Sequence, residues 1–265
     1  MRTNLIKTTL VVDEKPAKEK KATSAEGIHD MIIAFDTTGS MYSYLNAVKT
    51  HVTSLIPELL ATNPNMRIGV VAFGDYCDMP GKNKFGNAYQ SKELTRDAKS
   101  LIKFVKNAAR TSGGDNDEFY ELVIHKIINE TDWREDAIKT VLLIADASPH
   151  RIGYTYKNYV VDNQIDWREE AKDAASKCIQ FDTLSITGSS WYKELSDMTN
   201  GVYAPFISSS KTQEAVKMSA FSRGGMATID AFTSTMCSYE KAGDRELTAM
   251  ANAYSKKLST DINSR

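Results

Sequence analysis

Short apolar runs alternate with amphipathic segments along most of the chain. Runs such as MIIAF (31–35) and VLLIA (141–145) contain no polar residue, whereas the segments between such runs carry apolar residues at three- and four-residue spacing. Unbroken apolar runs of this length are typical of strands buried on both faces of a parallel sheet. The longer spacing is typical of amphipathic helices. The alternation predicts an α/β fold with a doubly wound, mostly parallel sheet and helices on both faces.

This pattern assigns elements to most of the chain between residues 29 and 204. The predicted strands cover residues 30–36, 67–73, 138–146, 179–187 and 202–204. The predicted helices cover residues 41–61, 96–110, 117–129, 165–178 and 189–200. Thr95 is placed to cap the second of these helices. Residues 74–91 are rich in glycine and have no clear periodicity, so no element is predicted there.

Both ends of the chain depart from the alternation. Residues 4–12 could form one strand, and the charged, proline-broken residues 13–27 are typical of a linker. Residues 226–262 are predicted to form helices without strands. We therefore expect an N-terminal arm (1–27), a main domain (28–222) and a helical C-terminal extension (223–265), with Gly224 and Gly225 as the hinge before the extension.

The C-terminal extension has two apolar stripes at helical spacing. The first comprises Met226, Ile229, Phe232, Met236 and Tyr239, and the second comprises Leu247, Met250, Ala251, Tyr254 and Leu258. Gly243 can end the first helix and Asp244 can cap the next. Short isolated helices are marginal in water, which favours a hairpin folded on the domain's own surface. The alternative is a hook that binds a neighbouring subunit.

Composition narrows the classes of partner. Of 265 residues, 42% are hydrophobic and 25% are charged, with a formal net charge of −1, which gives no electrostatic reason to expect nucleic acid or an anionic membrane as partner. No apolar stretch reaches the ~18 residues of a membrane-spanning helix, and the N-terminus lacks the apolar core of a signal peptide. The three cysteines lie far apart, with no Cys-x-x-Cys pair. They are expected to be reduced thiols, and the protein is expected to be cytoplasmic.

Unusual polar residues follow the predicted strands. DTTGS (36–40) follows the first strand, TSGGDNDE (111–118) precedes a helix, and DASPH (146–150) follows the strand at 138–146. Ligands of open α/β sheets bind at the carboxyl ends of the strands. If the strands that end in Asp36 and Asp146 are neighbours, their carboxylates repel each other unless a cation lies between them.

Neutral oxygens from Thr38 and Ser40 would complete an oxygen-rich site of the kind that suits Mg²⁺ or Mn²⁺. The alternative is that Ser40 caps the following helix and Asp36 closes a turn. The second acid, Asp146, at another strand end favours the metal.

The same motifs resemble a known family. DTTGS resembles the Asp-x-Ser/Thr-x-Ser signature of the von Willebrand factor A domain, which forms a metal-ion-dependent adhesion site in that family. TSGGDNDEFYE (111–121) and LLIADASPH (142–150) resemble the Gly-Gly-Gly-Asp-x-Pro-Glu and Leu-Ile-x-Asp-Ala-Pro-Pro-His motifs of its intracellular and bacterial branch. The resemblance covers residues 29–207 and implies a Rossmann-like sheet.

The resemblance also implies the metal ligands. They would be Asp36, Thr38, Ser40 and Asp146, joined by one residue of the middle loop. The family has a threonine in that loop, and both Thr111 and Asp115 are candidates here. His150 is expected to be a structural or peripheral residue, because imidazole suits a magnesium site poorly.

Three functions are compatible with these sequence features. The favoured one is a protein-binding module in which Mg²⁺ or Mn²⁺ is completed by an Asp or Glu of a partner, within a homo- or hetero-oligomeric assembly. The second is a structural component of a larger phage or bacterial assembly with a stabilising metal. A metal-dependent hydrolase or phosphotransferase using Asp36, Asp115 and Asp146 ranks last, since the sequence has no nucleophile-base pair and catalytic residues are not assigned.

Overall fold

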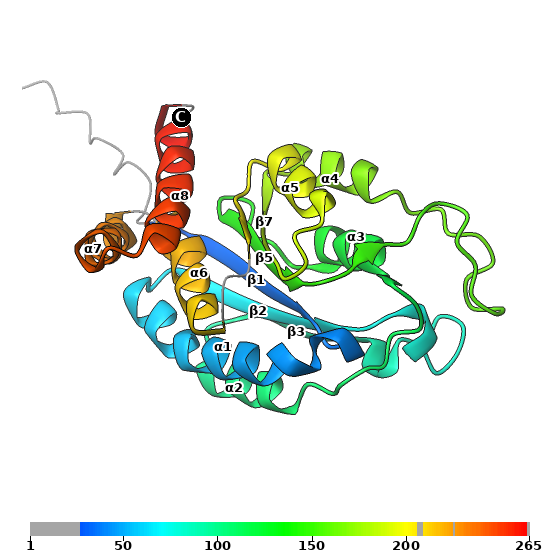
Figure 1. Ribbon diagram of the computed structural model, residues 1–265. Coiled ribbons are helices and arrows are strands. Elements are labelled where there is room, and N and C mark those ends of the chain that lie inside the picture. Colours follow the sequence, from blue (N-terminus) through cyan, green and yellow to red (C-terminus); the bar gives the residue numbers. More distant parts are fainter. Residues whose placement is uncertain (1–26, 206–208, 225, 264–265) are drawn as a thin grey trace, which may run out of the picture.

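A six-stranded sheet forms the centre of the molecule, with helices on both faces (Figure 1). The computed structural model describes residues 27–205, 209–224 and 226–263. The sheet contains β1 (His29–Asp36), β2 (Met66–Phe73), β3 (Tyr89–Thr95), β5 (Ile138–Ala145), β7 (Ile179–Ser185) and β8 (Tyr203–Pro205). The strand order is β3-β2-β1-β5-β7-β8, and every pair is parallel except β2 and β3. The predicted mostly parallel sheet is confirmed.

Helices cover the sheet in two layers. The α-helices are α1 (Tyr42–Thr62), α2 (Ala98–Asn107), α3 (Tyr120–Glu130), α4 (Trp167–Ser176), α5 (Ser190–Met198), α6 (Ser209–Phe221), α7 (Met226–Ala242) and α8 (Arg245–Asn263). Short 3₁₀ turns are η1 (Gly39–Met41), η2 (Tyr76–Asp78) and η3 (Gly86–Ala88). A separate two-stranded sheet pairs β4 (Asp117–Glu118) with β6 (Ser148–Pro149).

The side chains of β1 divide between two hydrophobic cores. Met31, Ile33 and Phe35 pack in the core beneath α1, α2 and α6, whereas Ile32 and Ala34 pack in the core beneath α3, α4 and α5. Successive residues of a strand point to opposite faces, so a strand buried on both sides has no face toward solvent. This explains the unbroken apolar run, and it confirms the doubly wound, Rossmann-like arrangement.

The structure corrects several predicted boundaries. α2 begins at Ala98, and Asp97 caps it by accepting a hydrogen bond from the Ser100 amide (3.1 Å). Thr95, the predicted cap, is instead the last residue of β3, and its hydroxyl accepts a hydrogen bond from the Asp97 amide (3.1 Å). α3 begins at Tyr120 and not at residue 117, because the preceding residues pair with β6.

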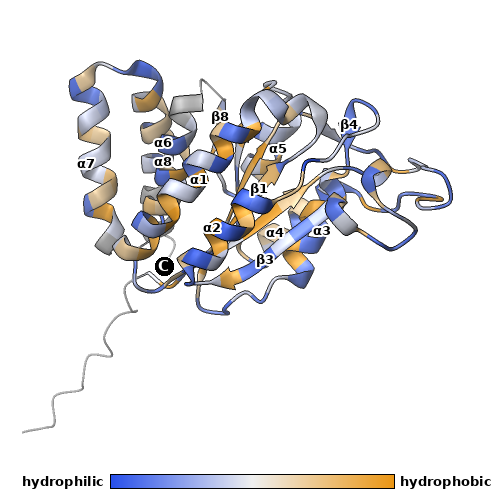
Figure 2. Cartoon of the chain, turned by 90° about the horizontal axis from the view of Figure 1, so that it is seen from below, coloured by the Kyte–Doolittle hydropathy of each residue, from blue (hydrophilic) through white to orange (hydrophobic). Residues whose placement is uncertain are grey.

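The C-terminal helices form a hairpin that packs on α6 (Figures 1 and 2). As predicted, the chain turns at Gly243 (φ +70°), and Asp244 accepts a hydrogen bond from the Leu247 amide (3.1 Å). Six stripe residues join the core shared with α1, namely Phe232, Tyr239, Leu247, Met250, Ala251 and Tyr254. The hairpin therefore folds back on the chain's own surface. It lies at the end of the molecule opposite the loops around residues 80 and 157 (Figure 1).

Some predictions fall outside the described residues. These are the strand at 4–12, the linker up to residue 26, Gly225 of the hinge, and the side chains of Met226 and Leu258. Within the described part of the chain, none of the helices combines the length and apolarity needed to cross a bilayer.

Candidate metal centre

The loops that carry the predicted site residues meet at the carboxyl end of β1. β1 lies between β2 and β5, so the tips of these three strands are adjacent. Backbone hydrogen bonds join the loops: the Thr37 amide donates to Phe73 (2.8 Å), and the Gly39 amide donates to Ser112 (3.1 Å). The β4–β6 pair joins the loop at 111–118 to the turn after β5. The loops at the strand tips thus form one connected cluster.

Asp36 organises the first loop from a fully buried position. Its Oδ1 accepts hydrogen bonds from the amide and the hydroxyl of Thr38, both at 2.7 Å, and its Oδ2 accepts one from the Tyr120 hydroxyl at 2.5 Å. Burial raises the pKa of Asp36 to about 7, against the effect of these hydrogen bonds, and the charge of Asp146 adds to the rise. A nearby cation would favour the ionised carboxylate.

A pair of hydroxyls connects Asp36 with Asp146. Thr38 Oγ1 lies 3.3 Å from Ser40 Oγ, and the Ser40 hydroxyl interacts with the Asp146 carboxylate in the direction that lowers its pKa. Asp146 is 9% exposed, and its buried Oδ1 has no hydrogen-bond partner. Ser40 is exposed, so the cluster is open to solvent on that side.

The two candidates from the middle loop have other partners. Thr111 Oγ1 lies 2.9 Å from Thr37 Oγ1, beneath the first loop. Asp115 is exposed, and it accepts hydrogen bonds from the Asp117 amide (3.0 Å) and the Tyr154 hydroxyl (3.3 Å). The structure thus brings together Asp36, Thr38, Ser40 and Asp146, and directs Thr111 and Asp115 elsewhere.

Glu118, which the sequence analysis did not single out, lies beside this cluster. It is 3% exposed, its carboxylate interacts with Thr38, and its Oε2 has no hydrogen-bond partner. Burial raises the pKa of Glu118 to about 10, and the charge of Asp36 is the next largest cause. In sequence, Glu118 is one of several acids in a polar loop, and acids in such loops usually face solvent. Only its pairing with β6 shows that it points inward.

A divalent cation fits these donors. Asp146 Oδ1 and Glu118 Oε2 are buried carboxylate oxygens without partners, an arrangement that is costly unless a cation satisfies them. All the donors are oxygens, as Mg²⁺ and Mn²⁺ prefer. Within the described residues, no three Asp, Glu, His or Cys side chains converge closely enough to hold a metal by themselves. The hydroxyls of Thr38 and Ser40 would therefore be needed as ligands.

His150 belongs to a buried network beside the cluster. Its Nε2 lies 2.7 Å from Asp75 Oδ1, its amide donates to Glu121 (3.1 Å), and the Tyr154 ring stacks on it with 3.6 Å between ring centroids. Burial by itself would lower the pKa of His150, but the hydrogen bond and charge of Asp75 outweigh it and raise the pKa above its ordinary value. This network holds the DASPH turn in place, which is a structural role.

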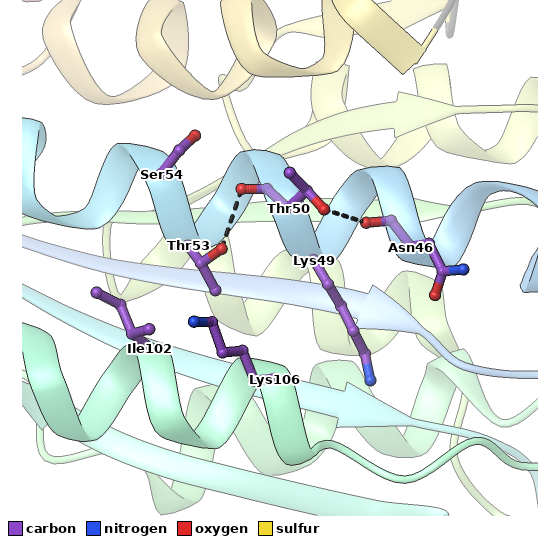
Figure 3. A pocket seen from close by; sticks show the side chains of 7 residues that line it. All are labelled: Asn46, Lys49, Thr50, Thr53, Ser54, Ile102 and Lys106. Atoms are coloured by element: carbon purple, nitrogen blue, oxygen red, sulfur yellow. Dashed lines mark hydrogen bonds between the residues drawn. The ribbon is translucent and has the colours of Figure 1, made fainter.

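An open groove of about 590 Å³ lies between α1 and α2 (Figure 3). It is lined by Asn46, Lys49, Thr50, Thr53, Ser54, Ile102 and Lys106. The hydroxyls of Thr50, Thr53 and Ser54 donate to carbonyls of their own helix. The groove offers two lysines and no convergent set of polar groups, so it is a weaker candidate than the strand tips.

Known proteins resemble the chain in sequence and in fold. The family model for the von Willebrand factor type A domain matches residues 30–222. A protein of Acanthamoeba polyphaga mimivirus, named as an ariadne-like RING finger protein, is 25% identical over 196 residues, which are 66% of this chain and 18% of the mimivirus protein. The chain therefore spans less than a fifth of that relative.

Two solved structures share the fold. The pilus adhesin SpaC from Lactobacillus rhamnosus GG, in its open conformation, aligns with a TM-score of 0.55 and 16% identity, over 73% of this chain and 30% of the adhesin chain. The SpRpn10 VWA domain aligns with a TM-score of 0.50 and 15% identity, over 71% of this chain and 95% of that domain. At these identities the likeness shows the fold alone.

Proposed function

The chain belongs to the von Willebrand factor type A domain family, and from this premise we propose that it is a protein-binding module that depends on Mg²⁺ or Mn²⁺. The observation that supports this proposal best is the series of linked oxygens from Asp36, Thr38, Ser40 and Asp146, which ends in a buried carboxylate oxygen without a hydrogen-bond partner. The pilus adhesin, with the same fold, is named for adhesion, which supports a binding role.

Each residue of the series has a distinct part in the proposal. Asp146 and the hydroxyls of Thr38 and Ser40 would hold the cation. Asp36 orients Thr38 through two hydrogen bonds and contributes negative charge. The exposed side of Ser40 leaves room for a partner's Asp or Glu. When bound, the metal supplies a positive charge that attracts such an oxygen.

A binding role fits the described residues better than catalysis. His150 is 2% exposed and is engaged by Asp75 and Tyr154, so it cannot serve as a general base for a group at the strand tips. Ser40, the exposed hydroxyl, lies beside the Thr38 hydroxyl and the Asp146 carboxylate and not beside an imidazole. These contacts favour a binding surface over a hydrolase.

The metal is tested by titrating the purified protein with Mn²⁺ in a calorimeter and by measuring its melting temperature with Mg²⁺ and with EDTA. We expect Asp146→Asn to lose at least about tenfold in Mn²⁺ affinity and to lose the thermal response, because it removes an anionic ligand. Asp197→Asn, on the exposed face of α5, makes the same change of charge and should match the wild type. Equal Mn²⁺ binding by all three proteins would contradict the metal site.

Partner binding is tested by affinity capture from a lysate of the source. We expect a protein that is retained with Mg²⁺, released by EDTA and not retained by Asp146→Asn. Replacement of single Asp or Glu residues of that protein should then abolish binding at one position. If capture is insensitive to both EDTA and the substitution, partner binding does not depend on the metal. Whether the metal itself binds is then decided by the Mn²⁺ titration alone.

A further inference from the structure

We propose that Glu118 is a direct carboxylate ligand of the metal, supplied by the chain itself in the middle loop. This inference rests on the proposed function, because it concerns the same cation. The sequence candidates for the middle-loop ligand were Thr111 and Asp115. The proposal assigns this role instead to Glu118, three positions beyond Asp115.

The β4–β6 pair fixes the direction of Glu118. Asp117 pairs with Ser148 and Glu118 pairs with Pro149, immediately after the turn that contains Asp146. Successive residues of a strand point to opposite sides. Accordingly Asp117 is exposed, whereas Glu118 is buried. The pairing thus directs Glu118, and not its acidic neighbour, toward the end of β1.

Gly113 provides the space that the Glu118 carboxylate occupies. A Cβ atom at this position would lie 2.5 Å from Glu118 Oε1 and 3.3 Å from Thr38 Cβ. Its φ of +70° is also in the left-handed region that favours glycine. Any larger residue at 113 would displace the carboxylate from Thr38.

The carboxylate continues the series of linked oxygens. The Glu118 carboxylate lies beside Thr38, Thr38 Oγ1 lies 3.3 Å from Ser40 Oγ, and Ser40 interacts with Asp146. Each end of this series carries one buried carboxylate oxygen without a partner. One cation beside the two hydroxyls would satisfy both oxygens, which no single protein donor in the cluster does.

A third carboxylate changes the charge of the loaded site. With Asp36 and Asp146 alone, a divalent cation is neutralised; with Glu118 ionised as well, the site keeps a net charge of about −1. The cation should therefore be held firmly before any partner arrives. A partner carboxylate would still bind the cation directly, but it would gain less from such a site than from a neutral one.

The test compares Glu118→Gln with Asp117→Asn, which makes the same change of charge one residue away on the exposed side of β4. In Mn²⁺ calorimetry, we expect Glu118→Gln to lose at least about tenfold in affinity and Asp117→Asn to stay within about twofold of the wild type. In EDTA, Glu118→Gln should melt no lower than the wild type, because a neutral amide removes the cost of burying an acid near Asp36 without a cation. A purely structural glutamate would instead give a lower melting temperature.

The outcomes separate this inference from the proposed function. If Asp146→Asn loses Mn²⁺ but Glu118→Gln binds it like the wild type, the Glu118 assignment is overturned and the metal site stands. If neither variant loses Mn²⁺, the proposed site itself fails.

If the Glu118→Gln variant does not fold, a second measurement on the wild-type protein tests the proposal. In wild-type protein labelled with ¹³C at its glutamate carboxylates, Mg²⁺ should shift an isotope-sensitive carboxylate band in the infrared difference spectrum. The absence of such a band would overturn the proposal.

Discussion

Two neighbouring threonines at the end of β1 have opposite surroundings. Thr38 faces the oxygen cluster, where its hydroxyl donates to Asp36 (2.7 Å) and lies 3.3 Å from Ser40. Thr37 faces the opposite side, where its hydroxyl donates to the Phe73 carbonyl (2.7 Å). Both are buried. Matched substitutions of these two threonines can therefore distinguish a metal ligand from a structural hydroxyl.

We expect Thr38→Val to abolish the thermal response to Mg²⁺ and to weaken Mn²⁺ binding at least about tenfold, because valine keeps the shape and removes the oxygen. Thr37→Val should retain both responses while losing about 1–2 kcal/mol of stability, because its hydroxyl is bonded both to the Phe73 carbonyl and to the Thr111 hydroxyl. Differential scanning fluorimetry with and without Mg²⁺, combined with urea unfolding in EDTA, measures both effects. A full metal response in Thr38→Val would remove this hydroxyl from the site.

Part of the site could be predicted from a short stretch of sequence. Asp36, Thr38 and Ser40 are grouped because they share one turn, which a short motif specifies. The environment of Glu118 depends on two residues of β4 pairing with β6, about thirty residues away in sequence. No local pattern encodes that contact. The middle loop was therefore the part of the site that sequence reasoning left open.

At the element scale, the amino end of β1 depends on a buried ion pair. Asp30 is fully buried and accepts hydrogen bonds from Arg67 (2.8 and 2.9 Å) and from Arg134, whose closest nitrogen lies at 2.6 Å. Arg67 is on β2 and Arg134 precedes β5, so the carboxylate ties three neighbouring segments together. This ion pair lies at the amino end of β1, whereas the metal cluster lies at its carboxyl end.

We expect Asp30→Asn to cost about 3–5 kcal/mol of stability, because it leaves two partly buried guanidinium groups without their anion. Asp132→Asn is the control: its carboxylate is 98% exposed, lies 3.6 Å from the same Arg67, and should contribute less than about 0.5 kcal/mol. Urea unfolding at neutral pH measures both variants. Equal losses in the two would contradict a role for burial.

The same carboxylate predicts a pH dependence. Burial by itself would raise the pKa of Asp30, but the hydrogen bonds and charges of Arg67 and Arg134 outweigh it and lower the pKa. Because the folded pKa lies below the unfolded value of about 3.9, the stabilisation is present above that pH and is lost as pH falls through the folded pKa. Asp30→Asn should therefore show a flatter loss of stability in acid than the wild type.

Two elements, β3 and α6, were not predicted from the sequence, and in both the apolar pattern is interrupted by polar residues. β3 lies at the edge of the sheet, where polar side chains such as Lys92 and Glu93 replace the apolar run of a central strand. α6 buries Thr212 and Ser219 among its apolar residues, so its buried face is not a continuous stripe of apolar residues. Elements buried on apolar faces were predicted, whereas these two depend on neighbours distant in sequence.

At the scale of the whole molecule, the C-terminal helices are joined to the sheet by a buried charge. Asp182 of β7 is fully buried and accepts hydrogen bonds from Ser219 (2.5 Å) and from the Arg223 guanidinium. Tyr254 of α8 is buried beside this pair and interacts with Ser219 and Asp182. The hairpin α7–α8 therefore completes a polar network as well as an apolar core. It does so at the end of the molecule opposite the metal cluster.

Two truncations separate these contributions. Ending the chain after Gly224 removes α7 and α8 but keeps Arg223, whereas ending it after Ser222 also removes Arg223. Both should lower the free energy of unfolding of the monomer, because the core side of α6 is exposed. The shorter protein should lose a further 3–5 kcal/mol or so, since Asp182 is then a buried charge without its cation. Mn²⁺ affinity should be unchanged in both, given the distance of the hairpin from the strand tips.

Urea unfolding and sedimentation velocity at equal protein concentration measure the outcome. If the hairpin were instead a hook for a second subunit, both truncated chains would keep the wild-type stability and sediment as a smaller species. Truncated chains that match the full-length protein in stability and in mass would contradict both roles, and with them the expectation that Tyr254 contributes to the fold. The burial of Tyr254 (1% exposed) against the Asp182 network leads us to expect the loss of stability, with no change in subunit number.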